Sequence, residues 1–527
     1  MIPRRKSIRR KLPAVLGAAL LCAVPAPAFT LAAAEARAGK VLIASSADML
    51  KNEFLVQGGD YSAAVHLLFN ALDSFCLDPR LLSIPRDGES PSPTMKALLG
   101  ELKGGIAITY YSSKSLPESL KDLKGKTEAY LRQLAAAAPE RIQWQAVDPD
   151  ERAAAVSKDA DQLSAFYADL ERRGIHPILT LESGELLDEG KAFFSAIELR
   201  SGNRPVEVLG VHRRVDQLEI ELARRVLKLT GPAPCRVFFW DGTRGDGGTG
   251  DPASRGKPTA SDYSAIMKSI DETYGLADDL RKELAARGGG PTASGAAPGE
   301  AAPPFSCLVI AQPHDIEERA AFEIARLVSE GVPSVFLVSG YTIDVSERGL
   351  RGGFPLTELR PVFDAVFRRW GVVLGADLVA SRACDTLPLP QPPKGNQPAA
   401  RANVPLPVLP KAAGDGLLKS HPLLTGVTSL VFPAAVGLTV NEEAVRRVGL
   451  KATLLSNSGK ESYTVRFSRL VAGKSKDEPV PFALKTKELS DVGARKDGFG
   501  EPRTLAVLLE GKVPFAFQGQ SPPEWKK

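Results

Sequence analysis

Short apolar runs alternate with amphipathic segments along most of this 527-residue chain. Runs such as 106–111, 235–240 and 305–311 have the length and the β-branched or aromatic content of buried strands. Between them, apolar residues recur at helical spacing, as in the charged stretch 218–229. Because strands and helices alternate, the sequence predicts an α/β fold with a doubly wound, mostly parallel sheet over 233–385.

Changes in this pattern, together with Pro- and Gly-rich stretches, predict how the chain is divided. The predicted parts are a signal peptide or signal anchor (1–39), a small α/β segment (40–92), an N-terminal α/β domain (93–232), the doubly wound α/β domain (233–385), a Pro-rich linker (386–415) and a β-rich C-terminal part (416–527). The chain is long enough for several domains and for a sizeable core.

The C-terminal part is predicted to consist mainly of short strands. Its uncharged stretch 423–440 is interrupted by glycines and a proline, which predicts two strands and a turn rather than a membrane span. Residues 503–509 and 513–517 flank Glu510-Gly511-Lys512 and are predicted to form a hairpin.

The N-terminus has the pattern of an export signal. Six Lys or Arg residues within 4–11 precede an uncharged apolar stretch over 12–24, and small residues follow at Ala26-Pro27-Ala28. A signal anchor is the alternative, since 12–34 is long enough to span a bilayer. Two prolines would burden that helix, so we favour cleavage. The positive flank stays in the cytoplasm, so we expect the body at the periplasmic or extracytoplasmic face of the inner membrane.

Composition excludes some functions. Apolar residues make up 43% and charged residues 24% of the chain, as in ordinary globular proteins. The net charge of +5 is not gathered into a basic stripe with interleaved aromatic residues, so we expect no nucleic-acid partner.

Four cysteines remain if Cys22 leaves with the signal, namely Cys76, Cys235, Cys307 and Cys384. The absence of a C-x-x-C pair argues against a zinc or thioredoxin-type motif. An oxidising compartment would permit disulfides. Cys235 and Cys307 both lie near the start of a predicted strand and could be neighbours, but buried free thiols are the favoured interpretation.

The Gly-rich loop 241–250 follows a predicted strand and is a candidate ligand site, with Asp241, Arg244 and Asp246 as its polar side chains. In open α/β sheets, ligands bind outside the carboxyl ends of the strands. A P-loop is excluded because Pro258 stands where a Mg²⁺-binding Ser or Thr is needed. A surface loop without a ligand is the favoured alternative.

His314 and Asp315 follow the next core strand and could meet Asp241 or Asp246 to hold a ligand or a cation. Asp315 is also well placed to cap a helix that starts at Ile316, and we favour this role over a metal site. No G-x-S-x-G elbow is present. We therefore predict no catalytic residues, no metal and no cofactor.

Several stretches resemble the GldG-type auxiliary proteins of bacterial ABC transporters, the gliding-motility family. They are 92–120, the helix and strand over 218–240, 307–313 with 370–377, and His421-Pro-Leu-Leu-Thr-Gly426 with 452–457. The resemblance implies an extracytoplasmic, membrane-associated partner of an ABC permease and ATPase. It also implies a Rossmann-like domain similar to one in intraflagellar transport proteins. It brings no catalytic residues.

Three departures from the family pattern stand out. Residues 241–246 replace the family's usual Gly-His-Gly-Glu loop, and no terminal membrane helix is expected in this sequence. Residues 40–85 resemble the segment that normally follows the family's last strands, as though permuted to the N-terminus. We therefore predict that strand 41–45 joins the sheet built by residues 503–518.

The leading functional hypothesis is a non-catalytic accessory subunit of an ABC-type transport or gliding-motility complex. The alternative is a soluble extracytoplasmic binding protein for a glycan or an anionic small molecule at loop 241–250. A hydrolase or amidotransferase-like enzyme is a weaker hypothesis, since a doubly wound fold does not imply catalysis. Cys307 lies within a predicted strand, a poor place for an exposed nucleophile.

Overall fold

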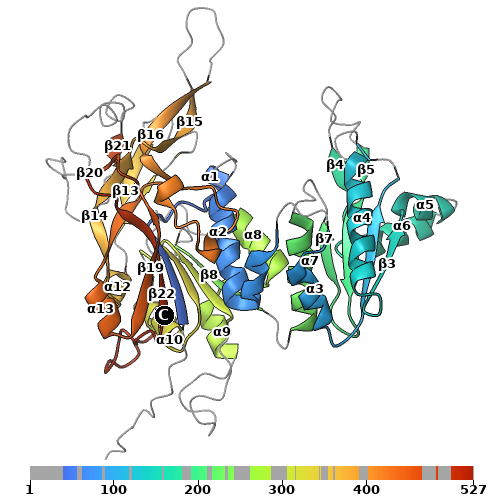
Figure 1. Cartoon of the computed structure of the whole chain (residues 1–527), viewed down its shortest axis with the longest axis horizontal. Helices are drawn as coiled ribbons and strands as arrows, with labels where there is room; N and C mark the ends of the chain where they lie inside the picture. Colours follow the sequence, from blue (N-terminus) through green and yellow to red (C-terminus); the bar gives the residue numbers. More distant parts are fainter. Residues whose placement is uncertain are drawn as a thin grey trace, which may run out of the picture.

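The computed structural model describes most of the chain from residue 39 onward. The described ranges are 39–55, 62–85, 90–114, 116–117, 121–156, 160–180, 191–210, 217–231, 235–242, 262–286, 305–314, 316–343, 345, 354–359, 362–390, 401–465, 482–484 and 500–525. The fold is mixed α/β with a β-rich C-terminal part, as predicted. Figure 1 shows a larger lobe built on the central sheet and a smaller N-terminal lobe beside it.

Ten strands of the described ranges form the central sheet, which has a parallel and an antiparallel half. The parallel half is β1 (Gly39–Ala44), β11 (Ser334–Leu337), β10 (Cys307–Ala311), β8 (Val237–Asp241) and β9 (Leu276–Ala277), in that order. The antiparallel half is β22 (Thr504–Gly511), β18 (Val436–Val440), β14 (Val372–Ser381) and β20 (Ser462–Val465), with β19 (Leu450–Asn457) on β22.

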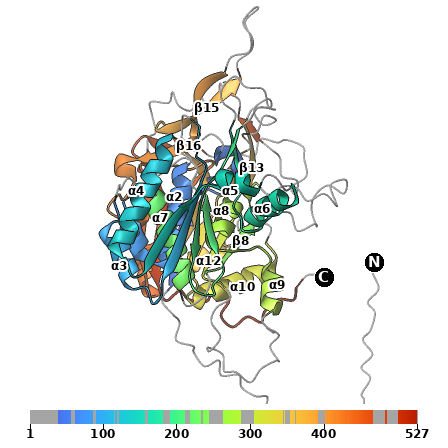
Figure 2. The same ribbon diagram turned by 90° about the vertical axis from the view of Figure 1, so that its right-hand side faces the viewer.

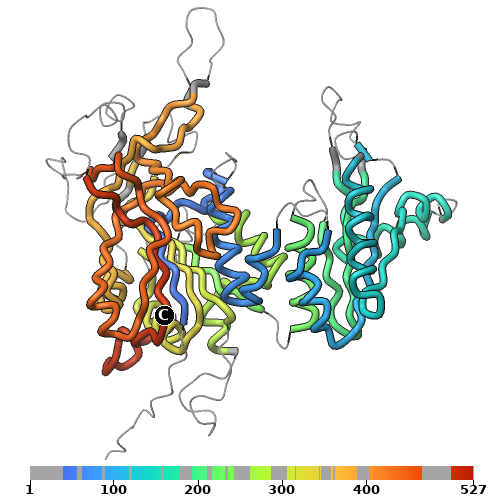
Figure 3. The backbone as a smooth tube through the Cα atoms, in the orientation of Figure 1, coloured from blue at the N-terminus to red at the C-terminus, as the bar shows by residue number. Residues whose placement is uncertain are grey.

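The predicted pairing of strand 41–45 with the C-terminal region is confirmed. β1 runs antiparallel to β22, with Leu42 opposite Leu508, and parallel to β11 on its other side. Figure 3 shows this N-terminal strand in blue next to the C-terminal strand in red. The single sheet therefore takes strands from the predicted segments 40–92, 233–385 and 416–527.

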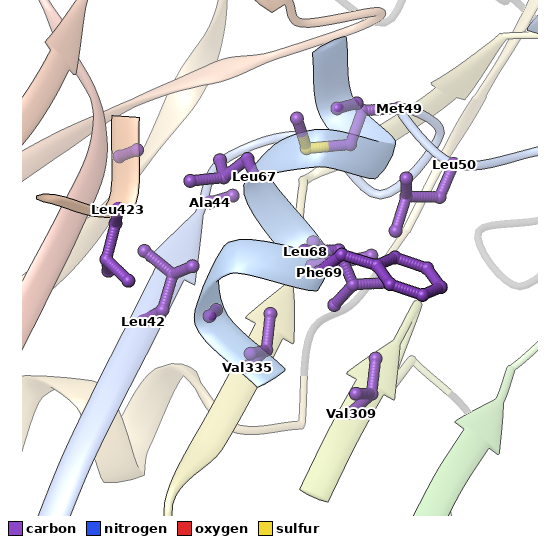
Figure 4. Close-up of a cluster of buried hydrophobic side chains, with 14 of the residues drawn as sticks. Leu42, Ala44, Met49, Leu50, Leu67, Leu68, Phe69, Val309, Val335 and Leu423 are labelled. Carbon is purple, nitrogen blue, oxygen red and sulfur yellow. The ribbon is translucent and has the colours of Figure 1, made fainter. Parts of the chain in front are cut away.

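Side chains alternate between the two faces of the sheet, and each face is covered by helices. One face carries Leu42, Val309 and Val335 under α2 (Ser62–Leu72) and α8 (Ser264–Thr273), as Figure 4 shows for α2. The other face packs against the helices α9 (Leu280–Ala286), α10 (Glu318–Ser329) and α12 (Asp364–Arg369). Helices on both faces make the parallel half doubly wound, as the sequence predicted.

The smaller lobe has its own sheet, ordered β3-β2-β6-β7. Its strands are β2 (Ile106–Ser112), β3 (Ile142–Val147), β6 (Ser195–Arg200) and β7 (Glu207–Gly210). The helices α3 (Pro93–Gly100), α4 (Lys121–Ala137) and α7 (Leu218–Thr230) pack on one face. On the other face lies α6 (Ala160–Arg172), which follows α5 (Pro149–Val156) (Figure 2). A short pair, β4 (Ile178–Thr180) and β5 (Lys191–Phe193), lies apart from this sheet.

A buried ion pair joins the lobes. The Arg224 guanidinium on α7 donates to the Asp73 carboxylate at 2.7 Å, and the Tyr274 hydroxyl after α8 donates to the same carboxylate at 2.7 Å. Asp73 opens a short π-helix, Asp73–Leu77, that continues α2. Arg224 also lies over the ring of Phe69. One carboxylate thus ties both lobes to the segment 40–92.

The predicted Pro-rich linker 386–415 is wrong. Most of it forms the antiparallel strands β15 (Cys384–Pro390) and β16 (Arg401–Ala413), and β16 also pairs with β17 (Ser429–Val431). Proline fits this pair because its ring already favours extended backbone and edge strands tolerate a missing N–H donor. Figure 1 shows the pair extending away from the central sheet.

The stretch 423–440 forms β17 and β18 and the turn between them, as predicted. No helix in the described part of the chain is long and apolar enough to cross a membrane. The hairpin predicted over 503–517 is wrong, because the described residues after β22, 512–525, form no strand. Instead Phe515 and Phe517 pack against Phe322 of α10, so burial on the helix outweighs strand pairing here.

The remaining described elements lie around these sheets. They are α1 (Asn52–Leu55), α13 (Glu442–Arg447), the 3-10 turns Pro79–Ser83, Gly414–Gly416 and Pro422–Leu424, and a sheet of β12 (Tyr341–Ile343), β13 (Phe354–Glu358) and β21 (Phe482–Leu484).

The strand β22 offers a matched test of the central sheet. Leu509 is fully buried and lies opposite both Val41 and Ala452, so Leu509→Ala should lower the free energy of unfolding by about 2–5 kcal/mol. Leu454 on neighbouring β19 is 49% exposed, so Leu454→Ala should change it by less than about 0.5 kcal/mol. Urea denaturation followed by circular dichroism measures both. Equal losses would show that β22 is not central to the core.

Candidate functional site

The carboxyl ends of β8 and β10 mark the point where the strand order reverses, because the strand that follows each of them is added on the opposite side of the pair. After β8 the chain passes through α8 to β9 on one side, and after β10 it passes through α10 to β11 on the other. The two helices lie on opposite faces. Such a switch point leaves a crevice outside the strand ends, which is where open α/β sheets bind ligands.

Asp241 is the last residue of β8 and is 7% exposed. It lies opposite Ala311 of β10, and the next N–H, that of Gly242, donates to the Ala311 carbonyl at 3.0 Å. A Cβ atom on Gly242 would lie 1.8 Å from the Gln312 carbonyl oxygen. Only glycine therefore allows the two strand ends to approach this closely.

Gln312 holds the other side of the switch point. It has a φ of 47°, in the left-handed region that a side chain rarely adopts. Its Nε2 donates to Asp48 Oδ1 at 2.7 Å, while its carbonyl oxygen lies 2.9 Å from Nδ1 of half-buried His314. The bend at Gln312 thus turns its side chain toward Asp48 and brings His314 to the strand end.

Asp48, which follows the end of β1, is the centre of this polar group. Its side chain is fully buried, and besides Gln312 it accepts from Lys51 Nζ at 3.0 Å, Thr342 Oγ1 at 2.8 Å and the Ile343 N–H at 2.8 Å. Lys51 Nζ also donates to Thr342 Oγ1 at 2.9 Å. The Asp48–Lys51 pair therefore holds together the carboxyl ends of β1 and β10 and the strand β12.

Two other side chains extend the group toward α8. Asp262 Oδ2 lies 3.7 Å from Lys51 Nζ, and the Tyr263 hydroxyl donates to the Ala47 carbonyl at 2.5 Å. Burial on its own would lower the pKa of Lys51, but the Asp48 carboxylate outweighs it and the pKa is raised. The Asp262 side chain is 53% exposed, and its partial burial raises its pKa despite Lys51, with the charges of Asp241 and Asp48 acting in the same direction. Burial also raises the pKa of Tyr263.

Of the predicted site residues, Asp241 and His314 lie at the ends of adjacent strands, on the two sides of the switch point. Arg244, Asp246 and Asp315 lie outside the described residues. Helix α10 begins at Glu318 with Glu317 as its N-cap residue, so the predicted start at Ile316 is two residues early. Within the described ranges, no group of three or more His, Cys, Asp or Glu side chains could hold a metal ion.

Sequence reasoning missed Asp48 and Lys51. The signal was present, because Ser45-Ser46-Ala47-Asp48 follows a predicted strand just as Asp241 does. What the sequence concealed was the neighbour. Strand β1 lies next to β11, about 290 residues later in the chain, and this places Asp48 beside Gln312 and Thr342.

An open, doubly wound α/β sheet with a polar group at its switch point defines the class of the larger lobe. Residues 255–527, just over half of the chain, match the family described as an ABC-type uncharacterized transport system, and the chain belongs to this family of ABC transporter auxiliary proteins. Residues 90–197, in the smaller lobe, match a domain of unknown function. No curated protein and no solved structure matches the chain.

The Asp48–Lys51 pair can be tested against an exposed pair. Asp48→Asn leaves the buried Lys51 charge with only the more distant and more exposed Asp262 carboxylate, and should lower the free energy of unfolding by about 3–5 kcal/mol. Glu443→Gln in the exposed Glu443–Arg447 pair should change it by no more than about 1 kcal/mol. In a double-mutant cycle, adding Lys51→Met should recover part of the loss. A loss below that of the exposed control would contradict the central role of Asp48.

Asp262 should give a pH-dependent effect. Its pKa is higher in the folded state, so its contribution to stability is present below the unfolded value of about 3.9 and is lost as the pH rises through the folded value. Asp262→Asn removes this loss, and its stability relative to wild type should increase between about pH 4 and pH 7. Denaturant unfolding across this range measures the difference.

The control for Asp262 is the same substitution made beside Lys51→Met. Lys51 partly offsets the unfavourable charge of Asp262, so the gain from Asp262→Asn should be larger without it. A difference between the two proteins that does not vary with pH would refute the electrostatic explanation.

Proposed function

We propose that this protein is a non-catalytic, extracytoplasmic accessory subunit of an ABC-type complex that contains a permease and an ATPase. The observation that carries the proposal is the family match over 255–527. The matched region contains β10, β11 and every strand of the antiparallel half of the sheet. The GldG-type resemblance adds the narrower proposal that this complex serves gliding motility.

The N-terminal sequence supports the extracytoplasmic placement. The basic stretch 4–11, the uncharged stretch 12–24 and the small residues after it have the order of an export signal. Export would place both lobes on the far side of the membrane from the ATPase, so the direct contact would be with the permease.

The polar group at the sheet edge supports a non-catalytic role. Both oxygens of Asp48 accept hydrogen bonds from the chain itself, and Lys51 Nζ is held between Asp48 and Thr342. A general base or acid has to exchange a proton with substrate. A carboxylate that already binds four donors serves better to hold strand ends together.

Copurification tests the proposal. The tagged full-length protein is crosslinked in its native cells, extracted from membranes and analysed by mass spectrometry. An exported protein of similar size with the same tag is the control. We expect an ABC permease and an ATPase to be enriched over the control. Recovery of the protein alone, from the soluble extracytoplasmic fraction, would overturn the accessory-subunit proposal.

The switch point supports the alternative, an extracytoplasmic binding protein. Asp241 and His314 lie on its two sides, where this fold class binds ligands. Among the described residues, the nearby charges are mainly carboxylates, and Lys51 is already paired. These charges favour a neutral glycan over an anion.

A thermal-shift assay tests this alternative on the purified protein. A glycan that binds only the folded state should raise Tm further at each higher concentration, with a logarithmic dependence above its Kd. Asp241→Asn should weaken that rise. The matched control is Asp271→Asn on α8, whose side chain accepts the Leu276 N–H at the amino end of β9, away from the carboxyl ends. A rise that is the same in wild type and Asp241→Asn would exclude the switch point as the binding site.

A further inference from the structure

Three cysteines from distant parts of the sequence meet at the amino ends of the parallel strands, opposite the candidate site. Cys307 is the first residue of β10 and lies opposite Val237 of β8, while Cys235 stands two residues before Val237. Both are buried in the same hydrophobic cluster. Cys76 belongs to the π-helix Asp73–Leu77 and packs against this cluster from α2's side of the sheet.

Cys76 lies beside both Cys235 and Cys307. None of the three is joined by a disulfide in this structure. The Cys307 thiol donates to the Leu308 carbonyl, with 3.6 Å between sulfur and oxygen. Ser306, the residue that precedes β10, hydrogen-bonds Cys235. One thiol from the segment 40–92 therefore faces two thiols of the sheet.

We propose that Cys76 and Cys235 are a substrate for disulfide donors and become joined by a disulfide bond. The partner chemistry is a donor disulfide, such as the active-site disulfide of a dithiol oxidase or oxidised glutathione. The product would be a covalent tie between the segment 40–92 and the start of β8.

The reaction is a thiol–disulfide exchange in two steps. The Cys235 thiolate attacks one sulfur of the donor, the donor S–S bond breaks, and one donor thiol leaves with a proton. The Cys76 sulfur, after losing its proton to solvent, attacks Cys235 Sγ in the mixed disulfide and releases the second donor sulfur as a thiol. The protein gives up two electrons and two protons, and the donor disulfide takes them up to become two thiol groups.

Cys235 is better suited to the first step than Cys307. A hydrogen bond from Cys76 lowers the pKa of the Cys235 thiol, with Ser306 and the charge of Lys228 acting in the same direction, and thiolates are the attacking form. Burial raises the pKa of Cys76, which suits the second step. Cys307 is in a strand paired on both sides, whereas Cys235 precedes β8. The disulfide requires the two sulfurs to come to about 2.0 Å.

This inference rests on the proposed function in one respect, since an extracytoplasmic compartment supplies disulfide donors and the cytosol keeps thiols reduced. The experiment therefore has an arm with purified protein, which tests the thiol pair, and an arm in cells, which tests the compartment.

In the first arm, reduced full-length protein is incubated with oxidised glutathione, quenched with a maleimide and mapped by mass spectrometry. We expect a Cys76–Cys235 peptide and the loss of two free thiols. Cys384→Ser and Cys307→Ala should keep this linkage, while Cys76→Ser and Cys235→Ser should abolish it. The oxidised form should melt about 5 °C or more above the reduced form, because the bond closes a long loop.

Mapping of the wild-type protein needs no variant, so a variant that fails to fold does not affect the test. A Cys76–Cys307 bond, mixed disulfides with glutathione alone, or thiols that all stay free would each overturn the proposal. In the second arm, cells are quenched in acid and alkylated before lysis, and the bond is expected in the native protein. A pair that oxidises when purified but is reduced in cells would instead refute the extracytoplasmic placement.

Discussion

The fold depends on β1, which is the first element of the described chain and lies in the middle of the central sheet. β1 accepts a parallel neighbour, β11, on one side and an antiparallel neighbour, β22, on the other. Without it, the doubly wound half and the C-terminal half of the sheet would each end in an open edge. The successive residues Val41 and Leu42 belong to the hydrophobic clusters on opposite faces of the sheet. The strand therefore also links the two halves of the core.

The ends of the parallel strands differ in chemistry, and β1 contributes to the difference. At the carboxyl ends, Asp48 follows β1. Its carboxylate accepts hydrogen bonds from Gln312 after β10 and from Thr342 and Ile343 of β12. At the amino ends, Cys235 and Cys307 meet Cys76 from the segment that follows β1. The same 40–92 segment therefore meets the sheet three times, through strand pairing, a buried charge and a thiol. Each contact fixes it more firmly than burial alone would.

Local pattern predicted much of this fold, because strand length and helical spacing are properties of neighbouring residues. The doubly wound order followed from alternation, and the β1–β22 pairing followed from the displaced family pattern of 40–85. The hairpin at 503–517 failed because Phe515 and Phe517 pack against Phe322, a contact that no local pattern contains. The linker at 386–415 failed because proline breaks helices yet fits extended edge strands. The local sequence pattern placed Asp241 at the end of a strand. It could not identify the partners of Asp48, because these depend on which strands are neighbours in the sheet.

The family match and the folded unit have different limits, and the strand order shows why. The matched region begins at residue 255, but the sheet into which its strands pack also needs β1 and β8, which lie before it. Removing β8 would separate β9 from β10, and removing β1 would expose the facing edges of β11 and β22, which carry unpaired backbone groups. Residues 255–527 are therefore a segment recognised by sequence and not a self-contained sheet. A permuted strand can complete such a sheet from either end of the chain, because a β-ladder requires backbone direction and register but no particular order of connection.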